Sequence, residues 1–215
     1  MDHKKIGILG SGKVGQVLAK AFIVDGYDVM VGSRDGHRAA EVDMALGMDV
    51  ATGTFREVAE WGELIILAVK GGAVEGVAGE LAGELAGKTV IDVTNPISDD
   101  PPENGVLHFF TTLEMSLGER IQVAVPEAHV VKAWNSVGYA HMIDPEFNTI
   151  PTMPICGNDE SARKEVADIV RGFGWEVEDM GMMTSARAIE PLCMLWCIPG
   201  FLRGEWNHVF KMVRK

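Results

Sequence analysis

Six residues near the start of the chain have the types and spacing of a phosphate-binding loop. They match the pattern G-x-G-x-x-G and are Gly10, Ser11, Gly12, Lys13, Val14 and Gly15. In this pattern the first glycine allows a tight turn, the second lets a pyrophosphate approach the backbone, and the third lets the following helix approach the strand. The N-terminus of that helix offers unpaired N–H groups to phosphate oxygens. The loop therefore predicts a dinucleotide-binding site.

The end of the second predicted strand, residues 27–31, carries the side chains that would select the dinucleotide. An acid at this point would bind the ribose hydroxyls of NAD, but here the chain continues with Gly32, Ser33 and Arg34. A hydroxyl and a guanidinium suit a 2′-phosphate, because arginine can form two parallel charge-assisted hydrogen bonds with it. Arg38 is a second candidate for that phosphate. NADP is thus predicted, although Asp35 could serve a ribose if the strand ends later, and both arginines could be plain surface charges.

Apolar strand-like segments alternate with helical periodicity along most of the chain. Such alternation implies right-handed crossovers and a parallel sheet with helices on both faces. We therefore expect an α/β fold of the Rossmann type, with a doubly wound, mainly parallel sheet. Residues 1–150 would form the NADP-binding domain. Residues 151–215 would form a small C-terminal α/β cap packed on it as one compact body, ending in a long helix from about Thr184.

Three further segments carry specific expectations. Residues 111–125, TTLEMSLGERIQVAV, look helical throughout, and residues 36–46 are expected to form a polar helix. The proline-rich and acidic stretch at residues 95–107 follows a predicted strand, where ligands bind in sheets of this kind.

The composition limits the possible partners. The formal net charge of −12 over 215 residues argues against nucleic acid or an anionic membrane, because both would be repelled. The first ten residues show no secretory signal pattern. The longest apolar run, residues 188–202, is short and interrupted by Glu190 and two prolines, so no membrane span is expected. A cytoplasmic protein is the resulting prediction.

No set of residues predicts acid–base or metal chemistry. Cys193 and Cys197 lie one helical turn apart and could share a metal, but small buried hydrophobic roles are favoured, and no disulfide framework is apparent. The histidines form no catalytic pattern; His108 and His141 are the two that would merit testing as pocket residues. Lys132, in a predicted strand, is expected to be an edge lysine whose ammonium reaches solvent.

The order of several motifs resembles one family. The segments GILGSGKVG, VMVGSRD, IDVTNPI, VVKAWNSV and PICGNDESARKEVADIVRGFGWEVEDMG are similar to those of F420-dependent NADP oxidoreductases, over nearly the whole chain. Enzymes of this family pass hydride between NADP and the deazaflavin coenzyme F420. The cytosolic reductase domain of the STEAP metalloreductases looks like a relative, and its hydride acceptor is a flavin.

The resemblance implies roles for particular residues. It implies that residues 10–15 bind the pyrophosphate and that Ser33 and Arg34 bind the 2′-phosphate. It implies a place beside the nicotinamide ribose for Ala68, Val69 and Lys70. Asn95 and Pro96 would lie beside the nicotinamide. The flavin-like acceptor would be faced by Trp134, Asn135 and Ser136. Phe and Thr are more common in the family where this chain has Trp134 and Ser136, and the insert after Pro96 is acidic for a neighbour of a polyanionic deazaflavin.

These observations predict an NADP-dependent oxidoreductase acting on coenzyme F420 or a related flavin such as FMN or FAD. An NADPH-dependent flavin or ferric reductase and a small-metabolite dehydrogenase are alternative enzyme functions. A non-catalytic NADP-binding sensor is an alternative of another class, because hydride transfer between stacked rings needs few side chains. A homodimer is expected from the apolar C-terminal helix and from the resemblance.

Overall fold

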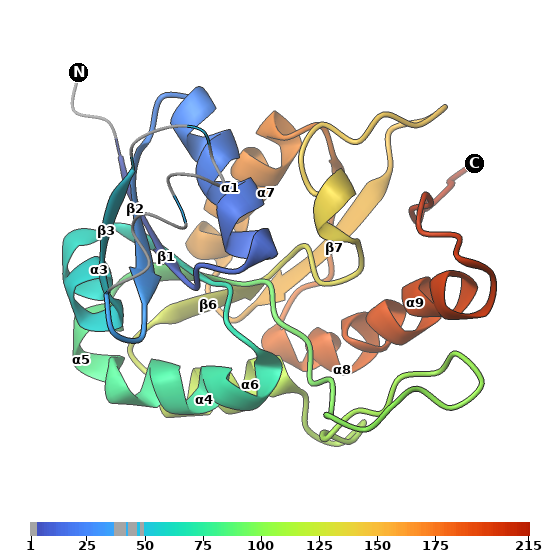
Figure 1. Cartoon of the computed structure of the whole chain (residues 1–215), viewed down its shortest axis with the longest axis horizontal. Helices are drawn as coiled ribbons and strands as arrows, with labels where there is room; N and C mark the ends of the chain where they lie inside the picture. The colour runs from blue at the N-terminus through green and yellow to red at the C-terminus, as the bar shows by residue number, and fades with distance from the viewer. Residues whose placement is uncertain (1–3, 37–41, 43–46, 48–49) are drawn as a thin grey trace.

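One eight-stranded sheet organises the part of the chain that the computed structural model describes, residues 4–36, 42, 47 and 50–215 (Figure 1). The strand order is β3-β2-β1-β4-β5-β6-β7-β8. The strands are β1 Lys5–Leu9, β2 Asp28–Ser33, β3 Ala51–Thr54, β4 Leu64–Leu67, β5 Thr89–Asp92, β6 His129–Lys132, β7 Thr152–Gly157 and β8 Glu176–Asp179. Strands β1 to β6 are parallel, β7 is antiparallel to β6, and β8 is parallel to β7. The predicted Rossmann-type, mainly parallel sheet is confirmed.

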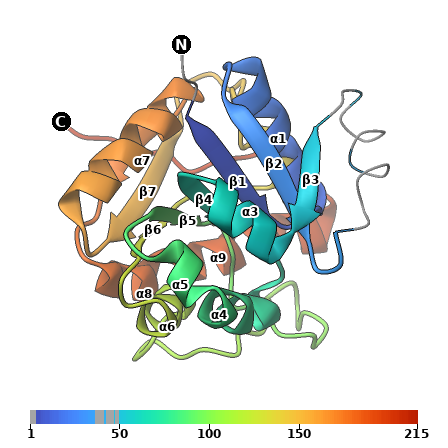
Figure 2. The same ribbon diagram turned by 90° about the vertical axis from the view of Figure 1, so that its left-hand side faces the viewer.

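Helices cover both faces of this sheet. Their bounds are α1 Lys13–Val24, α3 Phe55–Trp61, α4 Gly71–Glu80, α5 Ala82–Leu85, α6 Leu117–Ala124, α7 Glu160–Gly172, α8 Ala186–Ile189 and α9 Pro191–Arg203, with short 3-10 turns at Tyr139–His141 and Met183–Ser185. Helices α1 and α7 lie on one face, and α4, α5 and α6 lie on the other (Figure 2). The predicted helix at residues 36–46 lies almost wholly outside the described residues.

The central strand β4 shows how the sequence builds two cores. All four of its residues are fully buried. Side chains alternate between the faces of a strand, so Leu64 and Ile66 pack with α1 and α7. Ile65 and Leu67 pack with α3, α4 and α6 instead. A continuous apolar strand is therefore what a sheet covered on both faces requires.

Helix α6 begins later than its periodicity predicts. It starts at Leu117 because the Ser116 side chain accepts a hydrogen bond from the Glu119 N–H, while the Glu119 carboxylate accepts from the Ser116 N–H. This reciprocal capping box satisfies two N–H groups at the first turn. Residues 112 and 115 form an isolated β-bridge instead of helix. The expectation of a helix over residues 111–125 is therefore wrong for its first third.

The C-terminal helical run is nearly continuous from Met183 to Arg203. It divides into the 3-10 turn, α8 and α9, with Pro191 in the first turn of α9, where proline is tolerated because its missing N–H needs no partner. The following tail returns toward β7, where the Thr152 N–H donates to the Phe210 carbonyl at 2.9 Å. None of the helices in the described segments is sufficiently long and apolar to cross a bilayer.

The start of α4 gives a test of this packing. A Cβ on Gly71 would lie 1.9 Å from the Asn95 carbonyl oxygen, whereas a Cβ on Gly72 would meet no atom within 4 Å. Gly71→Ala should therefore destabilise the protein by about 1–3 kcal/mol through overpacking. Gly72→Ala should be neutral or stabilising by up to about 1 kcal/mol, because alanine favours helix over glycine. Urea unfolding of both variants measures the difference, and equal stabilities would contradict the described contact.

Candidate functional site

The glycine loop lies where the strand order reverses, between β1 and β4. Gly10 has φ of +135°, which a side chain would strain, and a Cβ on it would lie 2.3 Å from the Ala68 carbonyl oxygen. A Cβ on Gly15 would lie 2.0 Å from the Gly10 carbonyl oxygen. The Gly10 N–H donates to the Gly32 carbonyl at 3.0 Å, which ties the loop to the end of β2. This is the switch point at which open α/β sheets bind ligands.

The N-terminus of α1 is open to an anion. Its N-cap residue is Gly12, so no side chain caps the first turn. A Cβ at Gly12 would meet no atom within 4 Å, and both Gly12 and Lys13 are exposed. The unpaired N–H groups and the positive end of the helix dipole therefore face open space. The geometry fits the close approach of a pyrophosphate.

The predicted 2′-phosphate residues lie at the end of β2. Ser33 is buried, and its Oγ donates to the Asp35 carboxylate at 3.3 Å. Arg34 is exposed, and within the described residues its guanidinium forms no ion pair. A free, exposed guanidinium is what a phosphate ligand would require. Arg38 lies outside the described residues.

The loops after β4 and β5 are in contact at the same edge. Ala68 and Val69 are half-buried, Lys70 is exposed, and Lys70 occupies the N-cap position of α4. The next residue, Gly71, packs against the backbone of Asn95. The structure thus brings the predicted nicotinamide-ribose residues next to the predicted nicotinamide residue.

Asn95 and Asn135 hold the loops after β5 and β6 together. The Asn95 Nδ2 donates to the Asn135 carbonyl at 2.8 Å, and the Asn135 Nδ2 donates to the Ile189 carbonyl at 3.0 Å. Pro96 is buried, and Ser136 is 4% exposed. Within the described segments, the buried Asn135 Oδ1 has no hydrogen-bond partner. This pair therefore connects the sheet edge to the end of α8 and, among the described residues, retains an unused acceptor.

Trp134 lies in the core behind these loops. Its φ of +54° is unusual for a bulky residue and turns the chain sharply after β6. The indole is 1% exposed and packs beside Phe173 at a centroid distance of 6.1 Å. The indole packs into the core on the α7 side of the sheet. Direct contact of Trp134 with a flavin-like acceptor stays a prediction.

A buried ionic cluster lies directly beneath the two asparagines. Lys132 is fully buried, and its Nζ lies 2.6 Å from the Asp92 carboxylate, 3.0 Å from the Glu190 carboxylate and 2.9 Å from the Thr94 carbonyl oxygen. We call these four residues the Lys132 cluster. The expectation that Lys132 reaches solvent at an edge is therefore wrong, because β7 covers the outer side of β6 and two carboxylates hold the ammonium.

The Lys132 cluster also fixes a helix. The two carboxylate oxygens of Glu190 accept from the Leu117 and Gly118 N–H groups at the start of α6, at 3.0 and 2.9 Å. Asp92 accepts from the N–H and the hydroxyl of Thr94. Burial lowers the pKa of the Lys132 ammonium, but Asp92 and Glu190 raise it by more, so the net direction is upward and the lysine stays charged. Asp92 and Lys132, at the ends of two otherwise apolar strands, were the available sequence signal, whereas Glu190 lies between two helices.

Of the other candidate side chains, His108 is exposed and lines a pocket beside the loop after β5. His141 is half-buried, and its ring centroid lies 5.1 Å from that of Phe147. Cys193 is buried and Cys197 half-buried. Burial raises the pKa of the Cys156 thiol to about 12, so this cysteine is unreactive at neutral pH. In the segments that the structure describes, no three His, Cys, Asp or Glu side chains are placed to hold a metal ion.

Sheet topology, glycine loop and open helix N-terminus together define a Rossmann-type dinucleotide-binding protein. Residues 5–96 match the family described as NADP oxidoreductase, coenzyme F420-dependent. A crystal structure from Arthrobacter sp. FB24, assigned as an F420-dependent NADP reductase, has 32% identity and a TM-score of 0.90, covering 98% of this chain and 99% of that one. The chain therefore belongs to the family of F420-dependent NADP oxidoreductases.

The relatives of this chain include F420-dependent NADP reductases and metalloreductases. It is 26% identical over 202 residues to the F420-dependent NADP reductase of Methanocaldococcus jannaschii, covering 89% of this chain and 90% of that protein. It is 33% identical over 207 residues to the metalloreductase STEAP3 of Rattus norvegicus, covering 94% of this chain. The chain spans about two fifths of that metalloreductase, 39% of its length. An imine reductase from Streptomyces aurantiacus, at 18% identity and a TM-score of 0.67, shares the fold.

The Lys132 cluster makes a prediction about stability. Lys132→Met leaves two buried carboxylates without a counter-charge, so the variant should lose about 3–5 kcal/mol of unfolding free energy. Adding Glu190→Gln should restore part of this loss, because one of the unpaired charges is removed. The control Lys164→Met removes an exposed lysine paired with Asp168 and should change little. Urea unfolding measures all three, and a mild effect of Lys132→Met would refute the ionic role.

Proposed function

We propose that this protein transfers hydride between NADP(H) and a flavin-like ring, either coenzyme F420 or a flavin. The observation that carries the proposal is the meeting of four loops at one sheet edge: the glycine loop, the Ser33 and Arg34 turn, the β4–α4 loop and the Asn95–Asn135 pair. Family membership supports nicotinamide chemistry at this edge. The relatives include F420-dependent reductases and a metalloreductase, which supports a ring acceptor of either kind.

The described residues fit an NADP molecule along the edge. The N–H groups at the start of α1 would bind the pyrophosphate, and Arg34 with Ser33 would bind the 2′-phosphate. The β4–α4 loop would line the nicotinamide ribose, and Asn95 with Pro96 would flank the nicotinamide. Because Arg34 has no ion-pair partner among the described residues, binding a phosphate there would break no existing pair.

The chemistry demands positioning more than acid–base catalysis. When bound, the dihydronicotinamide supplies a hydride to a ring atom of the acceptor, and one proton from solvent completes the reduced acceptor. The protein would hold the two rings roughly 3–3.5 Å apart and exclude water. The Asn95–Asn135 hydrogen bonds and the buried Pro96 would help to hold this part of the edge in place. We propose no catalytic acid or base.

An acceptor panel tests the proposal. Purified protein and NADPH are mixed anaerobically with F420, FMN, FAD, and small imines and keto acids, and the nicotinamide absorbance is followed. Turnover with F420 or a flavin supports the proposal. Turnover only with imines or keto acids would identify a small-metabolite dehydrogenase instead. Tight NADPH binding without turnover would identify a sensor.

Arg34→Ala tests the choice of dinucleotide. The variant loses the charge-assisted interaction with the 2′-phosphate, worth about 1.5–3 kcal/mol in total, so NADPH should bind about ten- to a hundredfold more weakly. NADH lacks that phosphate and should bind the variant and the natural protein alike. Fluorescence titration of the reduced nicotinamide gives both dissociation constants.

Asp35→Asn is the matched control for this experiment. If Asp35 binds an NAD ribose, this variant should bind NADH more weakly than the natural protein does. Arg34→Ala should then change the dissociation constants of NADH and NADPH equally. That pair of results would overturn the assignment of NADP.

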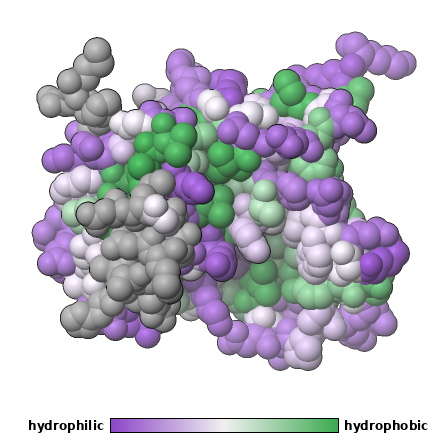
Figure 3. Space-filling view, turned by 45° about the horizontal axis from the view of Figure 1, so that its top comes forward, coloured by the Kyte–Doolittle hydropathy of each residue, from purple (hydrophilic) through white to green (hydrophobic). Residues whose placement is uncertain are grey.

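The homodimer also stays a proposal. The end of α9 and the tail after it expose large apolar side chains, namely Leu195, Phe201, Leu202 and Trp206. In the space-filling view, hydrophobic residues are visible in patches between hydrophilic ones (Figure 3). A second copy covering α9 would bury this apolar surface, and light scattering of the purified protein would show the doubled mass.

A further inference from the structure

A pocket of about 490 Å³ lies between the loop after β5 and the helices α8 and α9. Its walls come from residues 106–113 on one side and from Arg187, Glu190, Pro191 and Met194 on the other. The volume falls within the range of small-molecule sites. Among the described residues, no side chain predicted to bind NADP lines this pocket.

The pocket adjoins the edge where the nicotinamide is proposed to lie. The loop begins at Asn95 and Pro96, and the Phe110 N–H donates to the Pro96 carbonyl at 2.9 Å. On the other wall, Glu190 directly follows Ile189, whose carbonyl accepts from Asn135. Both walls are therefore continuous with the Asn95–Asn135 pair. A second substrate held here would lie between segments that are continuous with that pair.

The lining suits an aromatic ring with few charges. Leu107, Phe109, Pro191 and Met194 provide apolar surface, while Thr111 and Thr112 provide hydroxyl groups. A flat ring can stack on such a surface, and its carbonyl and imide groups can form hydrogen bonds with the threonine hydroxyl groups. The imidazole of His108 and the carboxylate of Glu190 also line the pocket. The Glu190 oxygens are already bound by the α6 N–H groups and Lys132.

The one arginine on the pocket wall is already neutralised. Arg187 binds the Glu119 carboxylate through Nε at 2.9 Å and through its terminal nitrogen at 2.6 Å. These hydrogen bonds lower the pKa of Glu119 to about 2, so the pair stays ionised at any ordinary pH. An anionic group entering the pocket would have to compete with this bidentate partner.

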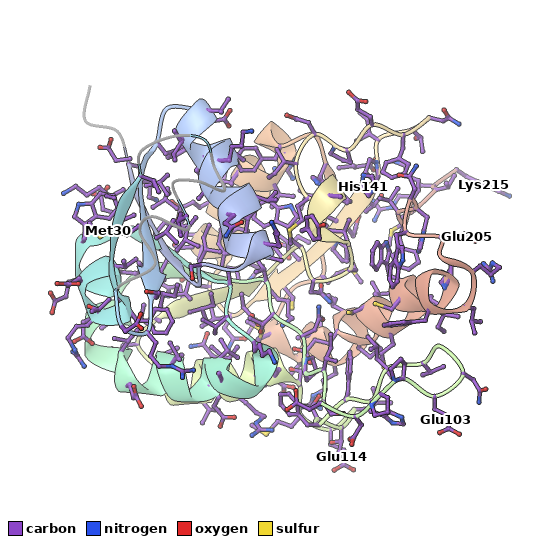
Figure 4. The ribbon with its side chains drawn as sticks, in the orientation of Figure 1. Met30, Glu103, Glu114, His141, Glu205 and Lys215 are labelled. Carbon is purple, nitrogen blue, oxygen red and sulfur yellow. The ribbon has the colours of Figure 1, made fainter. Side chains whose placement is uncertain are left out.

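The surroundings are strongly acidic as well. The two segments that form the walls, residues 96–120 and 183–205, contain seven carboxylates against three arginines. The other two arginines are also paired, Arg120 with Glu75 and Arg203 with Glu205. Glu103 and Glu114 project from the outer side of the loop, away from the body of the protein (Figure 4). The approach to the pocket therefore has a negative potential.

We infer that this pocket is the acceptor site and that it takes a flavin-type ring whose side chain carries no phosphate or carboxylate. The inference rests on the proposed function and narrows its substrate class. Glu119 is the specificity-determining residue, because it occupies the guanidinium that an anionic tail would need. Free flavins with a neutral sugar-alcohol chain belong to this class, whereas FMN and intact F420 do not.

Matched acceptor pairs test the inference by binding as well as by turnover. The pairs are riboflavin against FMN, and the deazaflavin chromophore of F420 without its tail against F420 itself. Quenching of their fluorescence, with NADP⁺ present at about pH 8, where a typical histidine carries little charge, gives dissociation constants. The uncharged member of each pair should bind about tenfold more tightly at low salt, and the ratio should shrink at about 0.5 M salt.

Two single substitutions separate the role of Glu119 from general charge. Glu119→Gln keeps the capping of α6, since glutamine also serves in a capping box, but it frees Arg187. It should improve the binding of FMN and F420 about tenfold. Glu114→Gln removes an equal charge from the exposed loop. For each acceptor pair, it should change the ratio of the two dissociation constants by less than about twofold.

The outcomes distinguish the inference from the proposed function. Tighter binding of FMN or F420 than of their uncharged partners, or equal effects of the two substitutions, would overturn the inference while leaving hydride transfer intact. Failure of both uncharged rings to bind would also overturn it. Selective binding of the uncharged rings without NADPH oxidation would support the pocket and reject the proposed reaction.

Discussion

The ammonium of Lys132, enclosed by Asp92 and Glu190, is the interaction on which the arrangement of the site depends. Two carboxylates and one ammonium in a fully buried place would be unfavourable without further partners. The remaining oxygens are satisfied by N–H groups at the start of α6 and by Thr94. One cluster therefore joins β5, β6, α6 and the beginning of α9, all of which border the proposed hydride site.

This cluster explains why the loops after β5 and β6, which carry Asn95 and Asn135, hold their relative position. Asp92 and Lys132 are register partners at the ends of β5 and β6. The residues that follow them, Asn95 and Asn135, then meet through hydrogen bonds above the cluster. A hydride site of stacked rings needs a rigid edge more than reactive groups. A buried ion pair with every partner in place supplies that rigidity without taking part in chemistry.

The dinucleotide side and the acceptor side of the edge differ in charge. Around the glycine loop the protein exposes backbone N–H groups at the start of α1, and the exposed Arg34 guanidinium forms no ion pair with the part of the chain that the structure describes. Around the pocket between the β5 loop and α9, each of the three nearby arginines already has a carboxylate partner. A protein with an overall charge of −12 can thus bind one polyanion at a local cationic spot while repelling a second.

Local patterns in the sequence were sufficient for the fold and for the dinucleotide loop. The spacing of Gly10, Gly12 and Gly15 and the alternation of strands and helices depend on neighbours along the chain, and the structure has both as predicted. Only the tertiary structure decided the state of Lys132, since the strand covering β6 and both carboxylates come from distant segments. The pairing of Arg187 was likewise decided by a distant partner, Glu119, whereas the start of α6 follows from the local capping box of Ser116 and Glu119.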